Sequence, residues 1–125
     1  MKEIIHSDKA PKAVGPYSQA VKTGNLVFTS GQLPIDPATG KFVEGGIKEQ
    51  TRQVLKNMKA VLNEAGTDFP QVIKALVLLD DIKNFADFNE VYAEFFPSNP
   101  PARSAFQVAA LPLGAMVEIE MIAEV

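Results

Sequence analysis

The chain has 125 residues, of which 46% are hydrophobic and 22% charged, and its formal net charge is -3. We expect one domain over residues 1–125, because a chain of this length builds one core. No apolar run reaches the roughly 20 residues that cross a bilayer, which excludes a membrane-spanning class. The acidic balance argues against a nucleic-acid partner, since such affinity needs clustered Lys and Arg. The absence of cysteine and of an apolar N-terminal signal makes the cytoplasm the expected location.

The N-terminal half predicts two strands and then a helix. The runs 17–22 and 25–30 are strand-like and are joined through Gly24, which suits a tight hairpin turn. Residues 31–46 are rich in Pro and Gly and are predicted to be loop, with room for a short extended piece at 41–43. From 47 to 65 the apolar residues recur at helical spacing, and Gly66 follows as a helix stop.

The C-terminal half predicts a strand, a second helix and two final strands. The nearly unbroken apolar run 72–79 is typical of a strand covered on both faces. A helix is expected over 84–96, with its aromatic residues on one side, and strands are expected over 102–110 and 116–124. The polar amide of Asn89 lies beside that aromatic stripe, where it either bonds to local backbone, is exposed, or binds a ligand.

This order of elements indicates an α+β fold with one sheet and two helices. Two helices that pack on one side leave the other face of the sheet bare, yet the run 72–79 looks covered on both sides. Another copy of the chain is the natural cover, so we infer a homo-oligomer.

Arg103 and Glu120 are the charged residues of interest in the last two strands. Alternation puts Glu120 on the face opposite the core, where it is either ordinary solvated surface or part of a site. In a direct hairpin about 111–114, Ala105 would oppose Glu120 and Arg103 would lie diagonal to it, at roughly 7 Å. In another strand order, the two side chains would meet only across a wider gap or a subunit boundary.

The chemistry of such a pair is specific. A guanidinium holds a carboxylate through two parallel hydrogen bonds, and an ionised glutamate orients and deprotonates water. The expected reactants are therefore a small α-substituted carboxylic acid and water. Other chemistries are disfavoured, because the chain has one histidine, His6, and no cysteine, and lacks glycine-rich phosphate loops. We expect no metal site.

Several stretches together resemble the RidA family, also called YjgF/YER057c/UK114. They are "GPYSQAV" (15–21), "TSGQLPIDPATG" (29–40), "FNEVYAEFF" (88–96), "PPARSAFQVAALP" (100–112) and "VEIEMIA" (117–123). The resemblance covers nearly the whole chain. It implies a fold similar to chorismate mutase of the Bacillus type, a six-stranded mixed sheet with two helices on one face. It also implies a homotrimer with clefts between subunits, and a last strand that inserts between earlier strands.

The resemblance also implies an activity, hydrolysis of reactive 2-imino acids that derive from 2-aminoacrylate to 2-oxo acids and ammonia, with no cofactor. Arg103 would hold the substrate carboxylate and Glu120 would activate water. The backbone of Ala105 would bond substrate or water, and the cleft would be lined by Tyr17, Ser30, Gly31 and Asn89. Many relatives have cysteine where Ala105 stands, so a function that rests on that thiol is in doubt here.

Other readings remain open at this point. The same cleft could bind 2-oxo acids or other small carboxylates as a sensor, without turnover. Endoribonuclease activity or translation inhibition is less favoured, given the acidic charge and the single histidine. Tyr17 could be a plain sheet aromatic, and Ser30 and Gly31 could serve only the turn that follows them.

Overall fold

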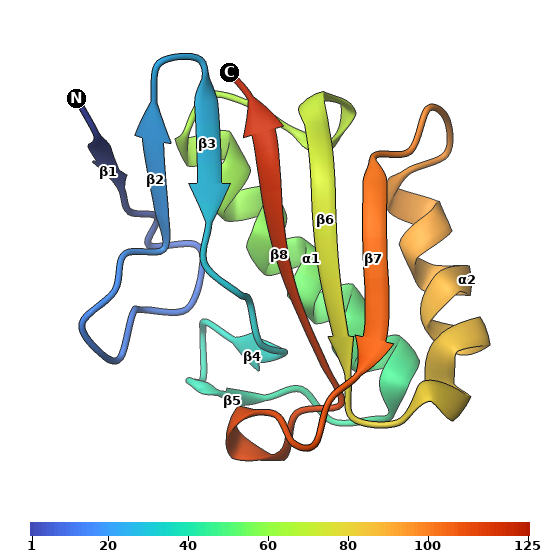
Figure 1. Ribbon diagram of the computed structural model, residues 1–125. Coiled ribbons are helices and arrows are strands. Elements are labelled where there is room, and N and C mark those ends of the chain that lie inside the picture. The colour runs from blue at the N-terminus through green and yellow to red at the C-terminus, as the bar shows by residue number, and fades with distance from the viewer.

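The computed structural model describes residues 1–125, and its centre is a six-stranded sheet in the order β1-β2-β3-β8-β6-β7 (Figure 1). The strands are β1 (Glu3–Ile5), β2 (Ala20–Thr23), β3 (Leu26–Thr29), β4 (Ile35–Asp36), β5 (Lys41–Phe42), β6 (Val72–Leu79), β7 (Ala102–Gln107) and β8 (Val117–Glu124). β6 and β7 are parallel and the other neighbours antiparallel, so the sheet is mixed. β4 and β5 form a separate small hairpin.

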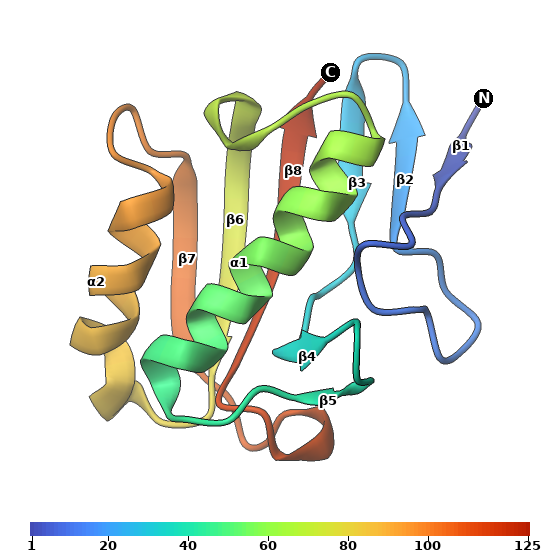
Figure 2. The same ribbon diagram turned by 180° about the vertical axis from the view of Figure 1, so that it is seen from behind.

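The two helices, α1 (Ile47–Glu64) and α2 (Phe85–Phe95), cover one face of this sheet (Figure 2). Short 3-10 turns lie at Phe69–Gln71, Ile82–Asn84 and Pro112–Gly114. The structure therefore confirms an α+β fold with a mixed six-stranded sheet and two helices on one face. No helix combines the length and the apolar character that a bilayer crossing requires.

Local sequence explains most element boundaries. Gly24, at φ +57°, turns the β2–β3 hairpin, and Gly66, at φ +90°, follows the end of α1 in the left-handed region where a side chain is disfavoured. β2 begins at Ala20 and not at the predicted position 17, because Gln19 bonds to Ser7 and Pro11 and holds the preceding segment as a loop. Strand β1 was not predicted from the local pattern.

Of the strand orders left open for the last two strands, the direct hairpin is wrong, and the insertion of the last strand between earlier strands, which the resemblance implies, is confirmed. β8 lies between β3 and β6, while β7 pairs in parallel with β6 at the edge of the sheet. The physical reason is that α2 links β6 to β7, and a strand-helix-strand unit makes its two strands parallel neighbours. β8 then takes the central position, where its inward residues are at most 1% exposed.

One face of the sheet is core and the other is open. Val77, on the helix face of β6, is fully buried, whereas Leu76 and Leu78 on the opposite face are only half-buried. Phe28 and Phe106, on the same open face, are 42% and 48% exposed. Within one chain the run 72–79 is thus covered on its helix face alone, and its open face is apolar. Cover of that face by another copy stays a prediction.

Candidate active site

Four of the predicted site residues line one cleft of about 610 Å³ beside the open face of the sheet. These are Tyr17, Ser30, Gly31 and Glu120. We call this cleft the carboxyl cleft, because Glu118 also lines it. Its rim carries the exposed apolar side chains Val14 and Leu113.

The walls of the carboxyl cleft are held by hydrogen bonds from neighbouring segments. The hydroxyl of Ser30 donates to the carbonyl of Ser18 at 2.6 Å, and its backbone N–H donates to Gln19 at 2.9 Å. Buried Asn57 of α1 donates to the carbonyls of Leu33 and Ile35, which keeps the loop after Gly31 in place. Ser30 therefore serves the local structure, as one of the two readings of the sequence proposed, and also faces the cleft.

Glu118 is the cleft residue that the sequence reasoning did not select. It is half-buried, and its carboxyl lies directly against Gly31, where an added Cβ would sit 2.8 Å from Glu118 Cδ. Burial, and then the charge of Glu120, raise the pKa of Glu118 above its ordinary value. The signal was present in the sequence, because the alternation that exposes Glu120 puts Glu118 on the same face.

Arg103 and Asn89 lie in a different cleft of about 500 Å³, between α2 and the start of β7. We call it the guanidinium cleft. Arg103 Nη1 donates to Asn89 Oδ1 at 2.9 Å, so the amide binds a side chain and is neither exposed at the margin nor bonded to local backbone. No acidic side chain forms an ion pair with Arg103. This half-buried cation therefore has no anionic partner within the chain.

Ala105 lines neither cleft. It is the register partner of Val77 on β6, and its side chain packs against the core on the helix face of the sheet. Because β7 is an edge strand, part of its backbone has no strand partner, which is compatible with a main-chain role for this residue.

Arg103 and Glu120 lie on opposite faces of the sheet. Arg103 aligns with Ala75 of β6, whose partner on β8 is Met121, and all three belong to the helix face. Glu120 aligns with Leu76, on the open face. One copy of the chain therefore cannot bring this guanidinium and this carboxylate to the same small molecule.

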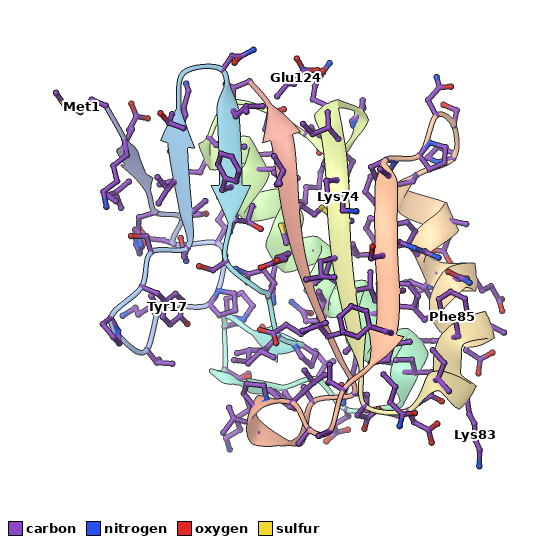
Figure 3. The ribbon with its side chains drawn as sticks, viewed as in Figure 1. Met1, Tyr17, Lys74, Lys83, Phe85 and Glu124 are labelled. Carbon is purple, nitrogen blue, oxygen red and sulfur yellow. The ribbon has the colours of Figure 1, made fainter.

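The two clefts also lie far apart across the sheet. Figure 3 shows Tyr17 beside the N-terminal strands and Phe85 on α2, beyond the β7 edge. Each cleft holds half of the chemistry that the sequence predicts. The carboxyl cleft can bind and deprotonate water, and the guanidinium cleft can bind an anion.

Comparison with known proteins places these observations in a family. Residues 7–125 match the family described as Endoribonuclease L-PSP. The human 2-iminobutanoate/2-iminopropanoate deaminase is 50% identical over 98% of this chain and 90% of its own. The crystal structure of the Rid protein YyfA from Yersinia pestis has a TM-score of 0.97 at 48% identity and covers 100% of both chains. E. coli TdcF, solved with bound serine, has a TM-score of 0.94 at 43% identity and 98% coverage of both. The chain thus belongs to the Endoribonuclease L-PSP family, the YjgF/RidA family that its sequence resembles.

Proposed function

We propose that this protein hydrolyses reactive 2-imino acids to 2-oxo acids and ammonia. The observation that carries the proposal is the unpaired guanidinium of Arg103, which lines an open cleft with no acid near it. Burying a cation without a counter-ion is unfavourable, and an incoming carboxylate would supply that counter-ion. A 2-imino acid presents such a carboxylate next to the carbon that water attacks.

The complete site is assembled from two copies of the chain in a closed homotrimer. The guanidinium cleft of one copy faces the carboxyl cleft of its neighbour, because a single chain holds the two on opposite faces of its sheet. The apolar open face, with Leu76, Phe28 and Phe106, is the surface that the neighbour covers. In a ring with closed rotational symmetry, each interface between neighbours then contains one complete site.

The reaction needs little beyond positioning. A carboxylate takes one proton from water as the oxygen bonds to the protonated imine carbon, and the C=N electron pair moves to nitrogen. The protonated carboxyl then gives this proton to nitrogen. The C–N bond breaks and ammonia leaves, while the carboxylate accepts the second water proton from the hydroxyl as the carbonyl forms. That proton then passes to ammonia, so imine cation and water become 2-oxo acid and ammonium. Orientation of the reactants supplies several kcal/mol of the barrier.

Two carboxyls are available for the proton transfer. The sequence points to Glu120, and the cleft geometry also favours Glu118, which is less exposed and is seated against Gly31. A base whose pKa is raised toward the working pH holds the abstracted proton better. We therefore assign Glu118 a share in water activation that the sequence-based proposal gave to Glu120 alone.

Two relatives support the choice of substrate class. The human protein is named a 2-iminobutanoate/2-iminopropanoate deaminase, and E. coli TdcF was crystallised with serine, a small 2-amino acid with a free carboxylate. Both span nearly this whole chain. The family description also names an endoribonuclease, but both carboxyls of the cleft would repel an RNA phosphate.

An assay in which an amino acid oxidase generates the imine in place tests the proposal. Wild type should accelerate release of ammonia and 2-oxo acid, whereas Arg103→Ala should lose on the order of a hundredfold in rate. Glu118→Gln and Glu120→Gln, measured side by side, separate the roles of the two carboxyls. If wild type binds 2-oxobutanoate without accelerating hydrolysis, the protein is a carboxylate sensor and the deaminase proposal fails.

A further inference from the structure

The guanidinium of Arg103 lies over three aromatic rings of α2. Its Cζ lies 4.9 Å from the ring centroid of Tyr92, 5.4 Å from that of Phe85 and 5.7 Å from that of Phe88. These residues are spaced by three and four along the helix, so they form one stripe that faces β7. Phe85 is the labelled ring on α2 in Figure 3. We call the three rings the aromatic cage.

The cage holds a cation without neutralising it. An aromatic face attracts a guanidinium through its quadrupole, but it takes none of the N–H donors that a carboxylate would occupy. The acids of α2 lie elsewhere. Glu90 pairs with Lys48 and Glu94 with Arg52, each at 3.0 Å, on the side that faces α1, and the charge of Asp87 also raises the pKa of Lys48. Of the five N–H groups of Arg103, one donates to Asn89, which leaves the others for a ligand.

The part that Tyr92 plays in the cage is its ring and not its hydroxyl. The residue is 5% exposed, and its hydroxyl is buried with no hydrogen-bond partner. Burial raises the pKa of Tyr92 to about 12, against the opposing effect of Arg103, so the phenol stays neutral at any working pH. The hydroxyl therefore does not hold Arg103. The contact is made by the ring, whose centroid lies 4.9 Å from Arg103 Cζ.

We propose that Phe85, Phe88 and Tyr92 are positioning residues that keep Arg103 in place while leaving its charge and its fork of donors free for a carboxylate. This inference rests on the proposed function for the identity of the ligand. An acidic residue in the same place would hold the arginine equally well, but it would compete with the substrate. The cage therefore sets affinity for the carboxylate, and it does not take part in proton transfer.

Three variants test the cage. Tyr92→Phe keeps the ring, Tyr92→Leu removes it, and Phe85→Leu removes a second, only partly buried ring. The dissociation constant of 2-oxobutanoate, measured by titration calorimetry, should stay within about twofold in Tyr92→Phe and rise about threefold to thirtyfold in both leucine variants. KM should follow the dissociation constant, and kcat should change less.

A second measurement needs no ligand. The guanidinium proton signals of Arg103 in the NMR spectrum should show ring-current shifts in wild type and Tyr92→Phe, and these shifts should shrink in Tyr92→Leu. Thermal unfolding confirms that each variant is folded, and Phe85→Leu carries the test if Tyr92→Leu is not. Unchanged affinity and unchanged Arg103 signals in folded leucine variants would overturn the cage, as would a Tyr92→Phe as weak as Tyr92→Leu. If wild type binds 2-oxobutanoate but does not hydrolyse the imine, the deaminase proposal is overturned, and the binding and NMR measurements still test the cage.

Discussion

Mixing two inactive variants should restore activity, because the proposed site takes its guanidinium and its carboxyls from different copies. One chain carries Arg103→Ala, and the other carries Glu118→Gln together with Glu120→Gln. In a closed ring assembled at random from equal amounts, each site needs an intact guanidinium from one copy and intact carboxyls from the next. The chance is one half for each, so about a quarter of the sites should be complete.

The assay follows imine hydrolysis after the two chains have been denatured together and refolded. Each variant refolded alone is the control, and refolded wild type defines full activity. We expect about a quarter of the wild-type rate from the mixture and almost none from either parent. The expectation depends on the alignment that puts Arg103 in the row of Met121 and Glu120 in the row of Leu76. A mixture no more active than its parents, with all chains folded and assembled, would refute a site shared between copies.

Three further predictions concern single residues. Gly31→Ala should displace the carboxyl of Glu118 and lower kcat about tenfold or more. An unchanged kcat would show that the position of the Glu118 carboxyl against Gly31 does not matter for catalysis. Burial and the charge of Glu120 raise the pKa of Glu118, so the folded protein binds this proton more tightly than the unfolded chain does. The contribution of Glu118 to the free energy of unfolding therefore falls as the pH rises above 4.5. Glu118→Gln should remove that fall, and its Tm advantage over wild type should grow from about pH 4 to about pH 7. Tyr92→Phe should leave the free energy of unfolding in urea unchanged or raise it by up to about 1 kcal/mol, because it removes an unpaired buried hydroxyl; a clear loss would reveal a bond of that hydroxyl.

The sequence determined the elements and the kinds of chemistry available. The helical period of residues 47–65, the Gly24 turn and the alternation of 117–124 depend on local spacing, and the structure has all three. Because the chain has a single histidine and no cysteine, the candidate catalytic side chains were an arginine guanidinium and glutamate carboxyls. The same alternation that exposes Glu120 could have identified Glu118, since one strand places both on the same face.

Only the tertiary structure decided where the two halves of the proposed site lie. Strand order depends on which apolar surfaces pack together over the whole chain, and neither the local pattern of 102–110 nor that of 116–124 contains this information. Because α2 makes β7 a parallel neighbour of β6, β8 takes the centre of the sheet, and Arg103 turns to the helix face while Glu120 turns to the open one. The aromatic cage arises in the same way, since α2 meets Arg103 only once the strand-helix-strand unit has folded.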